Sequence, residues 1–194
     1  MAVLYTTVAG RAAAEEIIEK SRFIANIASV SSKEEAEAFI SAIRGQYRDA
    51  THNVPAYIIG DKMQIQWGSD DGEPGGTAGT PIVQMLQREG ITNVVCVVTR
   101  YFGGIKLGTG GLVRAYTGCA KLALEKAGRY DVKEYISETV EIPYCNYDIM
   151  KYQEGKQAFA IRNCTFSENI SVEIEYEKDD EEAVKAVISG LIKR

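Results

Sequence analysis

The chain has 194 residues, of which 45% are apolar and 25% are charged, a composition typical of ordinary globular proteins. No run reaches the ~18 to 20 apolar residues that a membrane span needs, and the N-terminus lacks the basic start and long apolar block of a secretory signal. We therefore expect a cytoplasmic protein without membrane association.

The four cysteines and the single histidine argue against a metal site. No two cysteines form a C-x-x-C pair, and one histidine is too few to complete the common zinc ligand sets. We expect reduced thiols, no bound metal and no cofactor.

Charge is distributed unevenly along the chain, whose net charge is −5. Residues 1–130 carry 14 Lys and Arg against 13 Asp and Glu, a net of +1, whereas residues 131–194 carry 8 against 14, a net of −6. This asymmetry predicts two domains with different surfaces, 1–130 and 131–194. A polyanion would approach the first domain, because the second repels it.

The first 130 residues alternate between strand and helix patterns. Residues 32–35 (SKEE) form a capping box ahead of apolar residues at helical spacing. Residues 93–99 (NVVCVVT) form the continuous apolar run of a strand buried on both faces. Residues 12–18 read as extended, although their alanines and glutamates also fit the start of a helix. The predicted elements are strands over 12–18 and 22–30, a helix over 32–44, a hairpin of 53–59 and 64–67, a helix from a Thr80 cap to Gly90, a strand over 93–99 and a helix over 112–127 that Gly128 ends.

The remaining residues predict a smaller unit behind a polar link over 128–138. Apolar and polar residues alternate over residues 170–177 (ISVEIEYE), so one face of that strand is expected to be buried and the other acidic and exposed to solvent. The order β-α-β-β-α is one strand short of a split β-α-β-β-α-β unit. The predicted elements are a strand over 138–144, a helix over 147–159 with Gly155 inside it, a hairpin of 164–167 and 170–177, and a helix opened by Asp179 and Glu182 with Ala183, Val184, Val187, Ile188 and Leu191 inward.

The segment RYFGGIKLGTGGLVRAY, residues 100–116, concentrates glycines and cations. It matches neither a Walker loop nor the dinucleotide fingerprint, because the Gly-Lys-Ser/Thr sequence and the third fingerprint glycine are missing. Glycines ahead of a helix start would let an anion approach free N–H groups and the positive end of the helix dipole. The alternative is a compact turn that needs glycine only for positive φ angles and close packing. Three cations around one loop, Arg100, Lys106 and Arg114, favour the anion site.

A second unusual stretch, residues 69–81 (SDDGEPGGTAGTP), holds three carboxylates within four residues. They are Asp70, Asp71 and Glu73. Such a group could bind Mg²⁺ through oxygens, but its spacing does not match a calcium loop. We favour an Asp-Gly turn whose carboxylates pair with Arg100 or Arg114 and brace the glycine segment.

His52 is a candidate general acid or base beside Asp70, because an imidazole can exchange a proton near neutral pH. The alternative, which we favour, is a histidine satisfied by a local hydrogen bond. No Ser/His/Asp arrangement and no cysteine with the signature of a nucleophile is readable. Four aromatic residues could stack on bases, namely Phe23, Trp67, Tyr101 and Phe102, although most aromatic residues here fit the apolar faces of strands.

Four motifs together are similar to those of a known family. They are KSRFIA (20–25), ATHN (50–53), SDDGEPGGTAGTPI (69–82) and VVTRYFGGIKLGTGGLVRAYTG (97–118). In this order, over about residues 15–127, they resemble the IMPACT family, whose bacterial members are called YigZ-type proteins. The residues that match are Arg22, His52, Asp70, Asp71, Glu73, Thr77, Arg100, Tyr101, Gly103, Gly104, Lys106, Gly108, Gly110, Gly111 and Arg114.

The resemblance implies an α+β protein of two domains. The first would resemble domain 2 of ribosomal protein S5, and the second would be ferredoxin-like, similar to domain V of elongation factor G, without its last strand. Eukaryotic members regulate translation, but their partner-binding domain is absent from this sequence. For bacterial members the resemblance implies binding to RNA or the ribosome.

Three functions remain open on the sequence. The first is a translation-linked binding protein, in which the cations and glycine N–H groups hold an RNA phosphate and the acidic loop, including Thr77, supports them. The second is an enzyme for a small phosphorylated or peptidic substrate, with His52 and Asp70 as its acid–base pair. The third is an interaction module that binds a translation-related protein through the acidic second domain. The first function requires the two loops to meet in space.

Overall fold

The computed structural model describes residues 3–154, 156 and 159–192. Within these residues the chain forms two compact units, one from Tyr5 to Val132 and the other from Lys133 onward together with the residues up to Leu4. Each unit combines helices with an antiparallel sheet. The predicted α+β class is therefore confirmed.

An antiparallel sheet of five strands forms the centre of the first unit. Its strands are β2 (Ala12–Ile18), β3 (Ser21–Ser29), β4 (His52–Ile59), β5 (Ile65–Gly68) and β6 (Val94–Tyr101), in the order β2-β3-β6-β4-β5. β6 lies in the middle and is buried along nearly its whole length, as its apolar run predicts. Residues 12–18 form a strand whose exposure alternates, not the start of a helix.

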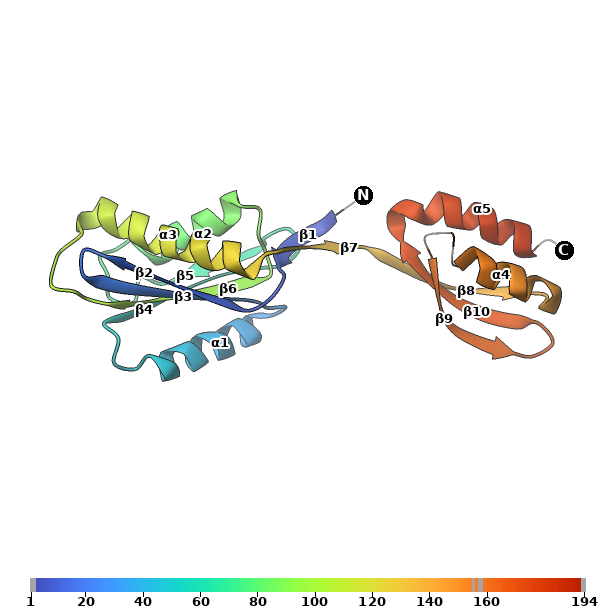
Figure 1. Ribbon diagram of the computed structural model, residues 1–194, viewed down its shortest axis with the longest axis horizontal. Coiled ribbons are helices and arrows are strands. Elements are labelled where there is room, and N and C mark those ends of the chain that lie inside the picture. The colour runs from blue at the N-terminus through green and yellow to red at the C-terminus, as the bar shows by residue number, and fades with distance from the viewer. Residues whose placement is uncertain (1–2, 155, 157–158, 193–194) are drawn as a thin grey trace. The chain divides into compact units, whose positions relative to one another are not determined.

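Three helices cover this sheet, with α1 (Lys33–Gln46) on one face and both α2 (Gly79–Arg88) and α3 (Gly108–Ala127) on the other (Figure 1). Alternate residues of β6 point to opposite faces. Val95 and Val97 pack in the cluster under α1, whereas Cys96 and Val98 join the cluster under α2 and α3. Arg100 is in phase with the second pair, so its side chain points to the face that carries α2 and α3.

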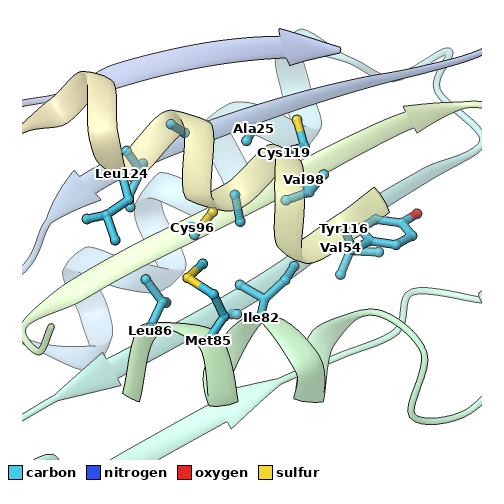
Figure 2. Packing of buried hydrophobic residues seen from close by; sticks show 14 of the residues in the cluster. Ala25, Val54, Ile82, Met85, Leu86, Cys96, Val98, Tyr116, Cys119 and Leu124 are labelled. Carbon is cyan, nitrogen blue, oxygen red and sulfur yellow. The ribbon is translucent and has the colours of Figure 1, made fainter. Parts of the chain in front are cut away.

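The larger apolar cluster of the first unit lies between the sheet and the helix pair α2–α3 (Figure 2). Ile82 and Leu86 of α2 meet Leu124 of α3 there, all buried. Burying each such side chain contributes about 1.5–3 kcal/mol. Figure 2 shows Tyr116 at one end of the cluster with its hydroxyl directed away from the other labelled side chains. The polar chemistry of this unit begins where the apolar cluster ends.

The starts of the helices agree with the sequence only in part. The predicted Ser32 cap of α1 is confirmed, because Ser32 Oγ accepts from the Glu35 N–H at 3.2 Å, but the Glu35 carboxylate accepts from the N–H of Ser31 and not from that of Ser32. The predicted Thr80 cap is wrong, since α2 begins at Gly79 and the Asp70 carboxylate, distant in sequence, accepts from its first N–H groups. The predicted start of α3 at Leu112 is also wrong, because the helix begins at Gly108. Glycine costs only about 1 kcal/mol in a helix, which the packing of a long helix outweighs.

A pair of strands that the sequence patterns do not predict joins the two ends of the first unit's chain. β1 (Val3–Val8) pairs with β7 (Arg129–Lys133), so residues 128–138 are not a polar link. Thr6 Oγ1 donates to Asp131 Oδ1 at 2.7 Å across the pair. Gly128 ends α3 at a φ of +73°, as predicted.

The second unit is a three-stranded sheet with two helices on one face (Figure 1). Its elements are β8 (Tyr135–Ile142), α4 (Tyr147–Glu154), β9 (Phe159–Phe166), β10 (Ile170–Glu177) and α5 (Glu181–Ile192), with short 3₁₀ turns at Tyr144–Asn146 and Lys178–Asp180. The strand order is β8-β10-β9, and no fourth strand joins it in the described part of the chain. The predicted order β-α-β-β-α is confirmed.

Several details of the second unit differ from the prediction. The strand predicted over 138–144 is β8 over Tyr135–Ile142, and the first hairpin arm predicted over 164–167 is the longer β9 over Phe159–Phe166. The helix predicted over 147–159 ends at Glu154, because Phe159 already pairs in β9; Gly155 lies outside the described residues. Ala183 is exposed, whereas Val184, Ile188 and Leu191 are buried as expected. A small residue at the edge of a helix stripe buries too little surface to fix its orientation.

Substituting Gly79 tests the packing of α2 on the end of β5. A Cβ on Gly79 would lie 2.6 Å from the backbone nitrogen and oxygen of Ser69. We expect Gly79→Ala to lower the free energy of unfolding by about 1–3 kcal/mol, because the backbone must shift. Urea unfolding followed by the fluorescence of Trp67, the single tryptophan, measures this in the first unit.

Gly118→Ala is the matched control, since Gly118 lies inside α3 and a Cβ there meets only Glu16 Oε2 at 4.0 Å. We expect this change to be neutral or to stabilise by about 0.5–1 kcal/mol. Equal unfolding midpoints for the two variants would contradict the predicted clash.

Candidate functional site

A hollow of about 430 Å³ opens where β4 starts, β6 ends and α3 begins. His52 and Arg100 face each other in the register of β4 and β6, and they form its floor. The residues that line this hollow are Thr51, His52, Glu73, Pro74, Arg100, Phe102, Lys106, Leu107, Gly108, Thr109 and Leu112. It therefore joins the acidic loop to the glycine segment, as the first function requires.

Arg100 is a buried cation on the floor of the hollow, with 4% of its surface exposed. Its guanidinium lies between two rings, 5.4 Å from the centre of Phe23 and 5.3 Å from that of Phe102. Nη2 donates to Ser21 Oγ at 3.3 Å, while Nε has no hydrogen-bond partner among the described residues. A charge this deeply buried requires a counterion.

Glu73 supplies that counterion from the acidic loop. Its Oε1 accepts from Arg100 Nη1 at 2.6 Å and from the hydroxyl of Tyr116 at 2.8 Å. Burial, and then the bond to Glu73, raise the pKa of Tyr116, so its hydroxyl stays protonated and donates. Only 4% of the Glu73 side chain is exposed. Removing one partner of such a buried pair typically costs about 3–5 kcal/mol.

His52 is oriented by the acidic loop and faces the same carboxylate. Its Nδ1 lies 2.8 Å from the carbonyl oxygen of Asp71. Because a carbonyl only accepts, Nδ1 carries a hydrogen, and Nε2 is left 3.8 Å from Glu73 Oε1. The His52 side chain keeps 19% of its surface exposed and lines the hollow. The local hydrogen bond favoured on the sequence is present.

The other two acidic side chains of the loop serve its structure. Asp70 accepts from the N–H groups of Gly76, Ala78 and Gly79 at 2.7–3.0 Å. Burial alone would raise the pKa of Asp70, but these backbone donors outweigh it and hold the pKa below its ordinary value. The structure therefore pairs His52 with Glu73 and not with Asp70.

Asp71 and Thr77 hold the loop to its surroundings. Asp71 accepts from Arg44 of α1 at 2.8 Å and from the backbone N–H of Asn53 at 2.7 Å. The Thr77 hydroxyl donates to the carbonyl of Pro74 at 2.6 Å. Of the three carboxylates only Glu73 lines the hollow, and it pairs with Arg100, which is one of the two partners that the bracing interpretation allows.

The glycines of the segment divide between packing and the helix start. A Cβ on Gly103 would lie 2.0 Å from the carbonyl of Lys20, and Gly104 has a φ of +88°, so both positions require glycine for structural reasons. Gly108, Gly110 and Gly111 lie in the first turn of α3 rather than in a loop. Their N–H groups therefore belong to a helix N-terminus.

The N-terminus of α3 differs from those of its neighbours in this unit. Ser32 caps α1 and Asp70 caps α2, but no side chain in the described parts of the chain caps α3. Its free N–H groups and the positive end of its dipole favour an anion nearby. Lys106 is exposed beside this turn and also lines the hollow, so charge and dipole have the same sign there.

Of the predicted anion-binding residues, only Arg100, Lys106 and Gly108 line the hollow; Gly103, Gly104, Gly110 and Gly111 do not, and neither do three larger side chains. Arg22 and Tyr101 pair in register on the opposite, α1 face of the sheet, where Arg22 binds Glu15 and Tyr101 donates to Asp49. Arg114 is exposed along α3 and lines separate hollows. Because side chains alternate along β6, Tyr101 and Arg100 point to opposite faces of the sheet. The sequence shows this alternation, but the prediction did not use it.

Tyr116 is a site residue that sequence reasoning missed. It follows Leu112 by one helical turn on the buried side of α3, and both are covered. Helical periodicity identifies it as a core residue but does not show that its hydroxyl reaches Glu73.

Two properties of the whole chain bear on the chemistry. Across residues 3–154, 156 and 159–192, no three or more His, Cys, Asp or Glu side chains gather in a way that could hold a metal ion. The helices in the same residues are too short or too polar to cross a membrane.

Comparisons with known proteins agree with this architecture. Residues 19–124 match the family model of the Impact N-terminal domain. The chain is 38% identical over 179 residues to the IMPACT family member YvyE of Bacillus subtilis, covering 92% of this chain and 82% of that protein. It is 46% identical over 114 residues to IMPACT family member YigZ of Escherichia coli, covering 57% and 55%. A crystal structure of a hypothetical protein matches with a TM-score of 0.65 and 31% identity, over 96% of this chain and 91% of that one.

The capping role of Asp70 predicts a pH-dependent stability difference between the protein and Asp70→Asn. The folded pKa lies below the ordinary value of 3.8, so the unfolded state takes up a proton first as pH falls. The stabilisation is therefore complete above the ordinary value and is lost as pH drops through the folded pKa. We expect the variant to be less stable by about 1 kcal/mol at pH 6.

Urea unfolding at pH 6 and pH 3, followed by Trp67 fluorescence, measures that difference. Asp61→Asn is the control, because Asp61 is exposed and accepts only one bond of 3.3 Å, from Asn93. If Asp70→Asn lowered the free energy of unfolding by as much at pH 3 as at pH 6, the carboxylate would not have the predicted capping role.

Proposed function

This chain belongs to the IMPACT family, and from that premise we propose that it is a translation-linked protein that binds RNA through a phosphate held in the hollow. Its link to translation comes from the family, whose eukaryotic members regulate translation. Its binding chemistry comes from the residues that line the hollow. The two supports are independent of each other.

The observation that carries the proposal is the uncapped start of α3 facing a buried, ion-paired arginine. Arg100 and Glu73 are each more than nine-tenths buried, and both line the hollow. The Nε–H of Arg100 has no partner in the described residues, but this atom is buried and is not a donor to the opening. The donors at the opening are Lys106 and the first-turn N–H groups of α3. Donors that converge on one opening favour a phosphate oxygen.

The distribution of charge disfavours a polyanion at the second unit more than at the first. Residues 1–130 carry a net charge of +1, against −6 for residues 131–194. Long-range attraction is therefore small, and recognition depends on contacts at the hollow. Asp70 and Asp71 do not line the hollow but hold the acidic loop in place, and Glu73 holds Arg100 directly.

A specific observation favours an enzyme as the second candidate. The Asp71 carbonyl fixes the hydrogen on Nδ1 of His52 and leaves Nε2 facing the hollow. In such an enzyme His52 would exchange a proton with a small phosphorylated substrate, with Glu73 beside it. The distance of 3.8 Å between His52 Nε2 and Glu73 Oε1 exceeds hydrogen-bond reach, so binding remains the first candidate.

Introducing a negative charge at Thr109 tests the proposal without disturbing the buried pair. Thr109 is exposed in the first turn of α3 and lines the hollow. We expect Thr109→Glu to fold normally, because a carboxylate near a helix N-terminus is stabilising, yet to bind a single-stranded RNA oligonucleotide at least about tenfold more weakly. Fluorescence anisotropy at several salt concentrations measures this.

Thr109→Gln is the control of matched shape without the charge, and it should bind as the unchanged protein does. Lys106→Gln should reduce the slope of log affinity against log salt by about 0.7, whereas Lys62→Gln, in the turn at the other end of β4, should leave it unchanged. RNA affinity that is the same in Thr109→Glu and Thr109→Gln would exclude the hollow as the RNA site.

A further inference from the structure

The hollow combines hydrogen-bond donors for an anion with an acceptor that a simple anion site does not need. Glu73 Oε1 meets Arg100, Tyr116 and His52, whereas Oε2 takes part in none of these contacts. Oε2 is also not among the buried atoms that lack a partner. A carboxylate oxygen only accepts, so a bound ligand must offer it a hydroxyl or an N–H.

From this juxtaposition we propose that the hollow binds one ribonucleoside monophosphate unit, whose phosphate lies at the start of α3 and Lys106 and whose ribose hydroxyl donates to Glu73. This inference rests on the proposed function and names the ligand unit of the same site. The unit occurs as a free nucleotide or as the 5′-phosphorylated end of an RNA chain, and both sources present the same phosphate and 2′-hydroxyl.

The walls of the hollow fit the rest of such a unit. Phe102 is 46% exposed and contacts Arg100 with one face of its ring. An exposed aromatic wall accepts any base by stacking, without reading its edges. Leu107, Leu112 and Pro74 add apolar surface on the other sides.

The size of the hollow limits the ligand to a single unit. About 430 Å³ is within the range of sites for small ligands. A duplex is instead held through phosphates spread along an open surface. The segment from Lys106 to Thr109 and the Glu73–Pro74 turn both border the opening, so one nucleotide enters and the chain continues outward.

The carboxylate also explains how such a site would distinguish RNA from DNA. A 2′-hydroxyl can donate to Glu73 Oε2, whereas a deoxyribose offers that oxygen no donor at the 2′ position. Sites built to bond a hydroxyl discriminate strongly against analogues that lack it, and the 2′-hydroxyl is the group that marks RNA.

Isothermal titration calorimetry of the full chain with three small probes tests the inference. We expect AMP to bind at least about tenfold more tightly than 2′-deoxy-AMP and than adenosine. Thr109→Glu should abolish AMP binding, and Thr109→Gln should retain it. Phe102→Leu should weaken AMP and 2′-deoxy-AMP by the same factor, because stacking does not involve the sugar. Equal affinities for AMP and 2′-deoxy-AMP, or no AMP binding, would overturn the inference.

Two RNA hexamers, one with a 5′-phosphate and one with a 5′-hydroxyl, identify the source of the unit. Preference for the phosphorylated hexamer assigns the site to a chain end, and AMP binding without that preference assigns it to free nucleotides. RNA binding that Thr109→Glu removes while AMP fails to bind would overturn this inference and leave the proposed function standing. AMP binding without any RNA binding would overturn the proposed function and leave this inference standing.

Discussion

The buried ion pair of Arg100 and Glu73 is the interaction on which the site depends. It places a charge of each sign at the ends of the central strands, where desolvation makes either charge unfavourable alone. By holding Glu73, it fixes the 69–81 loop against the sheet, and this loop in turn orients His52 and caps α2. The pair is thus structural and chemical at once: the contacts that fold the loop also determine which polar atoms remain for a ligand.

Elements that bury a face are predictable from the sequence because burial imposes a period. The apolar run of β6 and the apolar positions of α1 at helical spacing are examples, and both are observed to be buried. β1 and β7 are held by backbone pairing, which side-chain hydropathy does not record. The early start of α3 and the remote cap of α2 were not predictable either, since each depends on packing between segments distant in sequence.

The site was predictable in its composition but not in its detail. Opposite charges in two loops predict that the loops meet, and Glu73 and Arg100 do. Which carboxylate makes the contact depends on the turn at Asp71 and Gly72, whose φ angles of +47° and +89° send successive side chains in different directions. The motifs also grouped Arg22 with the glycine segment, although strand alternation separates it onto the other face.

Tyr116 belongs to the apolar cluster and to the polar network together. Its ring packs edge-on against Phe23 at 5.2 Å, and Phe23 in turn lies under the Arg100 guanidinium. The floor of the hollow is therefore not an independent surface but the outermost layer of the interior. A ligand that binds Glu73 would stabilise the folded first unit and so raise its melting temperature. A substitution that disorders the packing around Tyr116 would, in turn, displace the atoms that contact the ligand. Under the proposed function, ligand recognition and thermal stability would therefore both depend on Tyr116.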